Sequence, residues 1–210
     1  MVDTNCLTSL RVNTFRGLQN LPLYVAHHHG FFAEQRLRVE VSYTTGSTTQ
    51  LARLARGDYE LIQTAPDNVI HFDHDPDAFG VPVNGAPRVV MLLGGSNGPL
   101  SVYARPGVSS YDKLRGASLG VDNPSSGFAL VLRDLLLRAG LRLDHDYTFV
   151  VMGSTQMRLD ALLRGDIAAT ILYMPFDQIA AVHGCHRLAV STDHYPAYAS
   201  LATAGRQPWI

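Results

Sequence analysis

The side chains with the most chemistry to offer lie in short turns rich in glycine, serine and threonine. Two of these turns share the sequence Gly-Ser-Thr, at residues 46–48 and 153–155. A Ser-Ser-Gly turn lies at 125–127, and another polar turn covers residues 15–20. Each turn leads into a helical pattern, and the backbone N–H groups at a helix start bind carboxylate, sulfonate or phosphate-like oxygens. The turns therefore predict a site for a small anionic molecule.

The plainer alternative is that these serines and threonines only cap their own helices. Ser47 and Gln50 have the spacing of a capping box, in which each side chain binds a backbone N–H near the helix start. A cap of this kind satisfies the unpaired N–H groups of the helix itself. For any one turn, helix capping explains the residues at least as well as ligand binding does. Only the arrangement of the turns relative to one another can distinguish the two interpretations.

The turns recur because part of the sequence is repeated. Residues 46–58 read GSTTQLARLARGD, and residues 153–166 read GSTQMRLDALLRGD. Each copy continues into an apolar, strand-like segment, at 59–64 and 167–172. The RGD tripeptides suggest cell adhesion, but each falls where a helix ends, and glycine is the usual residue there. The repeat therefore indicates two copies of one structural unit.

Each copy extends upstream to an alternation of strand, helix, strand, helix and strand. Strands are predicted at 10–14, 39–44 and 59–64, and again at 117–121, 147–152 and 167–172. One helix is predicted from Pro22 to Gly30, and its counterpart from Ser125 or Ser126 to Gly140. Such alternation predicts parallel sheets covered by helices. The fold class is therefore α/β, with two similar lobes, each a mainly parallel sheet flanked by helices.

The lobes can be assigned to ranges of the chain. We expect residues 1–100 to form the first lobe, 101–192 the second, and 193–210 a segment that returns toward the first. Residues 89–105 carry two apolar runs and are predicted to cross between the lobes. Ligands of open parallel sheets bind beyond the carboxyl ends of the strands. Because the polar turns of both lobes follow strands, we expect them to face one cleft.

A second group of candidates follows the third strand of each copy. Asp67 and Asn68 could bond a polar or cationic group of a ligand, and Tyr173 or Phe176 could stack on it. Asp67 could equally cap a helix that starts at Asn68. Both interpretations stay open at this point.

Composition excludes several classes of partner. The 17 basic and 18 acidic residues are scattered and leave a net charge of −1, so we expect no binding to nucleic acid. No stretch is long and apolar enough for a membrane span, so we expect no direct membrane insertion. The opening residues lack the pattern of a secretory signal, so the chain is either cytoplasmic or has lost an export signal. Cys6 and Cys185 are too few for a disulfide framework, and we interpret both as free thiols.

The histidines are weak candidates for metal ligands. Residues 27–29 are all histidine, but consecutive side chains on a helix point about 100° apart and do not share one ion. The pair His71 and His74, and the group of His183, Cys185 and His186, lie in short segments that we expect at the periphery. We expect neither a metal nor a cofactor.

A family pattern appears once these features are combined. Residues 23–41, LYVAHHHGFFAEQRLRVEV, join a helix ending in Gly-Phe-Phe to a Leu-x-Val-Glu strand. Residues 111–127 hold YDKLRG, a Gly-Val strand and a Pro-Ser-Ser-Gly turn. The pattern resembles the substrate-binding proteins of ABC importers with the type II periplasmic-binding fold, in the sulfonate-, taurine- and nitrate-binding and thiamine-precursor-synthase-like (NMT1/THI5-like) group. Compared with that group, the C-terminal part of this chain is short.

The resemblance implies a hinged cleft between the lobes that closes on a small anionic or zwitterionic molecule, such as a sulfonate, a carboxylate or a pyrimidine-like compound. It also implies an ABC transporter membrane component as partner, and a periplasmic or extracellular location if an export signal was removed. The residues that it places against the ligand are Phe15, Gln19, Asn20, Thr45, Gly46, Ser47, Thr48, Thr64, Asp67, Asn68, Asn97, Ser125, Ser126, Gly127, Phe128, Met174 and Phe176.

Two other functions compete with a binding module. One is a cytoplasmic lyase, decarboxylase or dehydratase on the same fold, acting on a small carboxylate through Asp67, Asn68 and the serines. A thiamine-pyrimidine synthase would need a lysine for pyridoxal phosphate, and the only lysine, Lys113, lies in the predicted crossing segment. The other is the effector-sensing domain of a transcription regulator, but no helix-turn-helix pattern precedes Leu10. Nucleophile-elbow, Walker A and dinucleotide-binding patterns do not occur.

Overall fold

The computed structural model describes residues 7–207 and 209. By its contacts the chain divides into two compact units. Of the described residues, the first unit holds 7–44, Thr48–Ser96, 201–207 and 209, and the second holds Thr45–Ser47 and Asn97–Ser200.

The first unit is built on a five-stranded sheet with the order β2-β1-β3-β10-β4. Its strands are β1 (Thr8–Thr14), β2 (Leu37–Tyr43), β3 (Leu61–Thr64), β4 (Val89–Ser96) and β10 (Leu201–Arg206). β1 runs parallel to β2 and to β3, whereas β10 runs antiparallel to β3 and β4. The sheet is therefore mixed, and its three parallel strands are the ones predicted from the first copy of the repeat.

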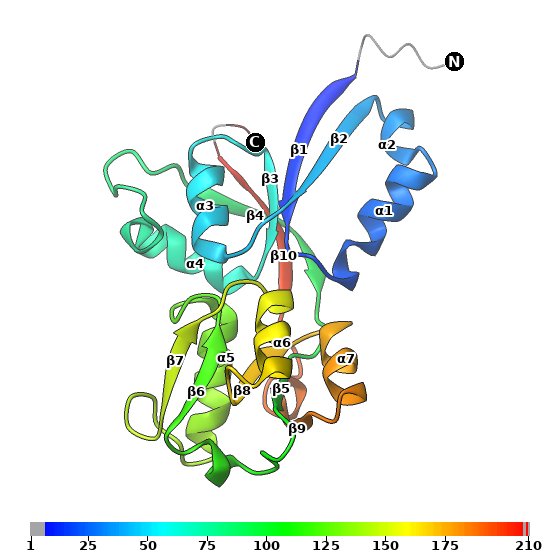
Figure 1. The fold of residues 1–210 in the computed structure, drawn as a ribbon. Coiled ribbons are helices and arrows are strands. Elements are labelled where there is room, and N and C mark those ends of the chain that lie inside the picture. The colour runs from blue at the N-terminus through cyan, green and yellow to red at the C-terminus, as the bar shows by residue number, and fades with distance from the viewer. Residues whose placement is uncertain (1–6, 208, 210) are drawn as a thin grey trace. The chain divides into compact units, whose positions relative to one another are not determined.

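Helices cover both faces of this sheet, with α3 and α4 on one side and α1 and α2 on the other (Figure 1). They are α1 (Leu21–His28), α2 (Phe31–Glu34), α3 (Ser47–Ala55) and α4 (Pro66–His74), with 3-10 turns at Leu18–Asn20 and Pro76–Phe79. The apolar core of the unit lies under α3 and α4, where Leu51, Leu54 and Phe72 pack on Ile62 of the sheet. Leu51 and Leu54 face the sheet because they are three residues apart on one helix.

The second unit repeats this plan. Its sheet has the order β7-β6-β8-β5-β9, from β5 (Ser101–Ala104), β6 (Ala117–Val121), β7 (Tyr147–Val151), β8 (Ala169–Leu172) and β9 (His186–Val190). β6 is parallel to β7 and β8, and β5 is antiparallel to β8 and β9. The strands of the second copy thus occupy the same places in this sheet as those of the first copy occupy in the other.

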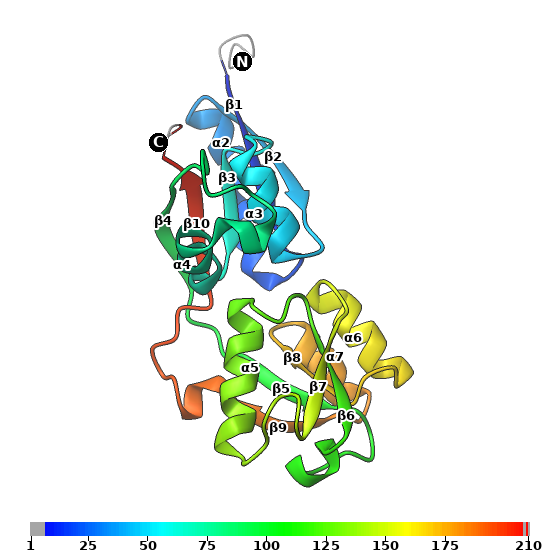
Figure 2. The same ribbon diagram turned by 90° about the vertical axis from the view of Figure 1, so that its left-hand side faces the viewer.

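Three helices flank the second sheet, namely α5 (Gly127–Arg138), α6 (Thr155–Arg164) and α7 (Phe176–Val182), with 3-10 turns at Tyr111–Leu114 and Ser191–Asp193. Figure 2 shows α5 on one side of the sheet and α6 and α7 on the other. Leu132, Leu135 and Leu136 of α5 are buried, as their helical spacing predicts. Leu159 and Leu162 of α6 form a separate core with α7 on the opposite face.

The glycines that end the repeated helices adopt the backbone conformation that glycine favours. Gly57 follows α3 with φ of 84°, and Gly165 follows α6 with φ of 82°. Side chains are strained in this left-handed region. The glycine of each RGD tripeptide therefore has the helix-stop role predicted for it.

Some features of the fold differ from the expected ones or lie outside the described residues. The strand predicted from residue 59 begins at Leu61, and the helix predicted to end at Gly30 ends at His28. Cys185 is a buried free thiol, and burial raises its pKa, whereas Cys6 lies outside the described residues. Among the described helices none is long and apolar enough to cross a membrane.

Candidate ligand-binding site

In the first unit, polar side chains gather where β1 ends. The carbonyl oxygen of Phe15, directly after β1, accepts hydrogen bonds from Gln19 Nε2 at 3.1 Å and from Asn20 Nδ2 at 2.7 Å. Asn20 is fully buried, and its Oδ1 accepts a bond from the Thr14 hydroxyl at 2.9 Å. The structure thus brings the three predicted residues of this turn together. The Asn20 side chain forms hydrogen bonds within the turn and stabilises it.

Gln50 does not make the capping box that its spacing predicts. Its side chain is fully buried and turns toward the sheet, where Nε2 donates to Asn13 O at 3.2 Å, to Asn13 Oδ1 at 3.1 Å and to Gln63 O at 3.1 Å. Its Oε1 is buried and has no hydrogen-bond partner among the described residues. The prediction was wrong because a capping box needs this oxygen to accept from the backbone at the helix start.

The residues after β3 sit at the start of α4. Thr64 is fully buried, and its hydroxyl oxygen accepts a hydrogen bond from Asn68 Nδ2 at 3.0 Å. α4 begins at Pro66 with Ala65 as its N-cap, so Asp67 lies inside the first turn and does not cap a helix from Asn68. That alternative for Asp67 is therefore wrong. The half-buried Asp67 carboxylate instead lies where the helix dipole favours negative charge.

In the second unit, Ser126 is the N-cap of α5. Its hydroxyl oxygen accepts the N–H of Ala129 at 3.3 Å, and its proton is donated to Asp122 Oδ1 at 2.6 Å. The side chain is 3% exposed. The single proton of this hydroxyl is already donated to Asp122, so it cannot also be donated to an anion. The Ser126 side chain therefore works inside the turn.

Ser125 is the exposed member of the pair. Its backbone N–H donates to Asn123 Oδ1 at 2.7 Å, and the N–H of Ser126 donates to the Asn123 carbonyl at 3.0 Å. Asn123 thus fixes the turn from the inside. Of the three residues of the turn, Ser125 is exposed, whereas Ser126 and Gly127 are buried.

Arg158 is the largest fully buried side chain of the described residues, with 2% of its surface exposed. It lies on α6, where Nη1 donates to Gly153 O at 2.8 Å and Nη2 donates to Thr155 Oγ1 at 3.0 Å and to Ile171 O at 3.4 Å. Nη1 also lies 3.7 Å from Asp122 Oδ1, a charge pair at the carboxyl ends of β6 and β8. Burial lowers the pKa of Arg158, while Asp122 and Tyr173 act in the opposite sense. The guanidinium remains charged, because the pKa of arginine is far above neutrality.

Three aromatic rings follow one another at the same end of the second sheet. Tyr173 contacts Phe128 edge to face with centroids 5.8 Å apart, and contacts Phe176 in the same way at 5.7 Å. Phe176 is buried, while Met174 is 45% exposed. Of the predicted residues here, Phe128 and Phe176 are held by packing on Tyr173, and Met174 is open to solvent.

The remaining predicted residues belong to two loops. Thr45 is exposed, Gly46 and Thr48 are half-buried, and Ser47 is buried as the first residue of α3. Asn97 is exposed just after β4. The structure therefore places all the predicted residues at strand ends, at helix starts or in the loops beside them.

Neither Arg158 nor Asp122 was predicted from the sequence as a site residue. Arg158 lies three residues after Thr155 and four before Leu162, so it belongs to the buried stripe of α6. It also occupies the place that Gln50 occupies in the other copy of the repeat, directly before Leu159 as Gln50 stands before Leu51. Both signals were present in the sequence.

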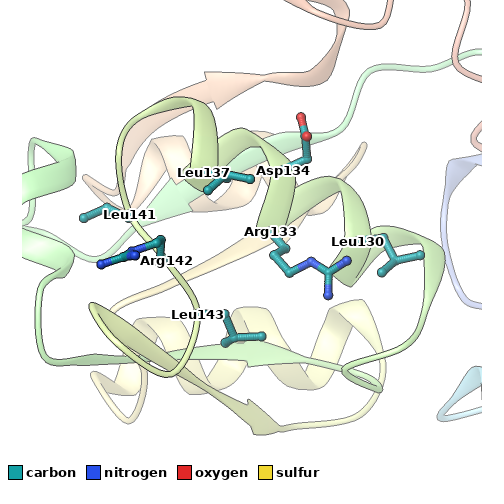
Figure 3. Close-up of a pocket in the computed structure, with 7 residues that line it drawn as sticks. All are labelled: Leu130, Arg133, Asp134, Leu137, Leu141, Arg142 and Leu143. Atoms are coloured by element: carbon teal, nitrogen blue, oxygen red, sulfur yellow. The ribbon is translucent and has the colours of Figure 1, made fainter.

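Other candidate sites in the described part of the chain lie elsewhere. Within residues 7–207 and 209, no three His, Cys, Asp or Glu side chains come together as a metal site would require. His71 instead packs edge to face on Phe79. A cavity of about 200 Å³ lies along α5 (Figure 3), lined by Leu130, Arg133, Asp134, Leu137, Leu141, Arg142 and Leu143. None of these lining residues belongs to the polar turns.

Solved structures share this fold. The alkanesulfonate-binding protein SsuA of Xanthomonas axonopodis pv. citri, bound to MOPS, has a TM-score of 0.75 at 15% identity, over 96% of this chain and 66% of that one. The periplasmic nitrate-binding protein NrtA of Synechocystis PCC 6803 has a TM-score of 0.83 at 12% identity, over 97% of this chain and 56% of that one. SsuA of Escherichia coli has a TM-score of 0.67 at 17% identity, over 96% and 62%. The chain thus spans less than two thirds of the length of these proteins, and it has the fold of periplasmic binding proteins.

Sequence comparison agrees with the fold. No curated protein sequence matches the chain. A family model described as NMT1/THI5 like matches residues 18–203, which is most of the sequence. The chain therefore belongs to the NMT1/THI5-like family.

Proposed function

We propose that this protein binds a small anionic or zwitterionic molecule, a sulfonate, a carboxylate or a pyrimidine-like compound, as the solute-binding component of an ABC importer. The observation that carries the proposal is the duplication of polar turns at the carboxyl ends of parallel strands. In the second unit the turn at 125–127 opens α5, where the helix dipole favours negative charge beside the cap that Ser126 makes to Ala129. The N–H groups at a helix start favour an oxyanion.

The structural neighbours support the chemical class. SsuA of Xanthomonas axonopodis pv. citri was solved with MOPS, a sulfonate, and NrtA is a nitrate-binding protein. Both compounds carry small, charged oxygen groups, which backbone N–H groups and hydroxyls can bind. Ser125, on the exposed side of its turn, is the side chain we assign to contact such a group. The buried Ser126 holds the turn in place.

The proposed partner and location follow the same relatives. A solute-binding component delivers its ligand to the membrane component of an importer. We accordingly place this protein in the periplasm or outside the cell. A binding component of an importer needs a site that holds its ligand and no catalytic group. The polar turns, and a sequence in which the usual catalytic patterns do not occur, fit that role.

A thermal-shift screen followed by mass analysis tests binding against catalysis. MOPS, taurine, nitrate, small carboxylates and pyrimidines are each added at millimolar concentration. At 100 times its dissociation constant, a ligand stabilises the folded state by about 2.7 kcal/mol. We expect at least one anion to raise the melting temperature by several degrees and to be recovered unchanged. A compound that is converted during incubation contradicts the binding function and points to an enzyme.

A further inference from the structure

Each unit of the fold carries one fully buried polar side chain at the same position of the repeat. Gln50 in α3 stands directly before Leu51, and Arg158 in α6 stands directly before Leu159. Gln50 is 0% exposed and Arg158 is 2% exposed. Long polar side chains are rarely buried this deeply unless partners hold them.

Both side chains reach from the helix back to the strand ends. Gln50 Nε2 donates to Asn13 at the end of β1 and to the carbonyl of Gln63 in β3. Arg158 donates to the carbonyl of Ile171 in β8 and lies 3.7 Å from Asp122, the residue after β6. Both residues therefore link the second helix of the repeat to its third strand, and each also approaches the carboxyl end of the first strand.

The two links differ in charge. The first unit uses neutral amides, whereas the second uses a guanidinium and a carboxylate. Arg158 Nε is buried and has no hydrogen-bond partner among the described residues. Burying an incompletely bonded cation is costly, and a nearby anion is what offsets the cost. Asp122, whose side chain is 8% exposed, is the carboxylate that does so.

Asp122 connects this charge pair to the predicted anion-binding turn. Its Oδ1 accepts the Ser126 hydroxyl at 2.6 Å, and Ser126 in turn accepts the N–H of Ala129 at 3.3 Å. Arg158, Asp122 and Ser126 thus form a continuous chain of contacts from α6 to the start of α5. Arg158 itself is too deeply buried to touch a ligand in this structure.

We propose that Arg158 is a positioning residue that fixes the Ser125–Ser126 turn through Asp122. Its charge neutralises Asp122, and Asp122 orients Ser126 so that the start of α5 is held ready for an anion. The expected effect of Arg158 on ligand affinity rests on the proposed function, whereas its role in holding the turn does not. Arg158 therefore governs affinity without contacting the ligand.

The test compares three variants of the full chain. R158Q installs the side chain that the first unit uses at this position and leaves Asp122 without its cation. D122N/R158Q removes both charges. The asparagine keeps one oxygen to accept the Ser126 hydroxyl, and its amide can donate to the Ser47 hydroxyl, which donates to Asp122 Oδ2 at 2.8 Å in the original protein. R133Q is the matched control, because Arg133 is exposed on α5 of the same unit and lines the cavity along that helix, outside the turn.

The rate of amide hydrogen exchange, measured without any ligand, reports how firmly the turn is held. We expect R158Q to speed exchange at residues 125–129 by at least about tenfold relative to the rest of the second unit. D122N/R158Q is expected to bring exchange at these residues back to within about threefold of the original protein. R133Q is expected to leave it unchanged. A purely structural role would accelerate exchange throughout the unit and would give no selective recovery.

Affinity for MOPS or nitrate supplies the second readout. We expect R158Q to weaken the binding of whichever probe binds by about tenfold, and D122N/R158Q to recover most of that loss. If neither probe binds the original protein, the proposed function fails for these anions, and the exchange data still decide the role of Arg158. The proposal is overturned if R158Q leaves exchange at 125–129 unchanged. It is also overturned if D122N/R158Q does not fold or exchanges as fast as R158Q.

Discussion

Ser125 and Ser126 are neighbours in one turn, yet they have different surroundings. Ser126 is buried, donates to Asp122 and accepts from Ala129, while Ser125 is exposed. The buried Ser126 should therefore affect the stability of the fold, whereas the exposed Ser125 can affect the binding of a ligand. The two serines therefore offer a way to separate the role of a helix cap from that of a ligand contact.

Single substitutions should separate these roles. We expect S126A to lower the free energy of unfolding by about 1 kcal/mol, because it removes the N-cap of α5. S125A should lower stability less than S126A does, because Ser125 is exposed, and should weaken anion binding about tenfold, by the loss of a hydrogen bond to a charged group. Denaturant unfolding and calorimetric titration measure the two effects.

S109A is the control for these serine variants, because Ser109 is exposed in the same unit and lies outside the turn. It should change neither stability nor affinity. Equal affinity in S125A and in the original protein would remove the Ser125 side chain from the site.

Among individual residues, those of the polar turns could be predicted from the sequence, whereas the buried side chains that stabilise the turns could not. Ser126 as a helix cap could be predicted, because serine before an apolar helical pattern is a strong local signal. The burial of Arg158 could not be predicted with the same ease, because arginine is mostly exposed. Its partners, Asp122 and Ile171, are distant along the chain and meet it only in the folded sheet.

Helices and strands form the next scale, where the repeated glycines that end α3 and α6 can be tested. Gly57 and Gly165 both have φ above 80°. A Cβ at Gly165 would lie 3.5 Å from Arg105 Nη1, whereas one at Gly57 would lie 2.9 Å from Arg206 Nη2. Both sites disfavour a side chain, and Gly57 has the tighter surroundings.

We expect G165A to lower the free energy of unfolding by about 1 kcal/mol, the cost of placing alanine in the left-handed region. G57A should cost at least as much, because the Arg206 side chain must also move. Denaturant unfolding measures the two losses of stability, as shifts of the midpoint with an unchanged dependence of the unfolding free energy on denaturant concentration. G94A is the control, since a Cβ at Gly94 meets no atom within 4 Å and its backbone is not left-handed. A loss in G94A as large as in G165A would contradict the conformational explanation.

Elements with a strong local pattern were predictable, and those made by distant pairing were not. β6 was predicted at its observed bounds, and α5 was predicted from its buried leucines. β10 was not predicted, because Leu-Ala-Thr-Ala-Gly-Arg has small residues and a glycine and thus little strand propensity. It becomes a strand by pairing with β3 and β4, more than a hundred residues earlier in the chain.

At the scale of the whole molecule, duplication is the feature that connects sequence, fold and function. Both units use one strand order, with the parallel strands of the repeat at corresponding places. Both place a polar turn after a strand and before a helix, and both secure the second helix with a buried polar side chain. This duplication could be predicted from the sequence, because two GST…RGD segments are easily aligned. The ligand could not be predicted, because hydroxyls and backbone N–H groups bind many different oxyanions.

Calorimetric titration of the full chain with MOPS shows directly whether the protein binds a small anion. The neutral comparison compound is 3-morpholinopropanol, which replaces the sulfonate of MOPS by a hydroxyl. If the protein binds anions at its polar turns, MOPS or another sulfonate, carboxylate or nitrate ion should bind with one site per chain. The neutral analogue of the anion that binds should bind at least about tenfold more weakly, because charge-assisted hydrogen bonds are lost. Equal binding of anion and neutral analogue, or no binding by any of these anions, would contradict the account.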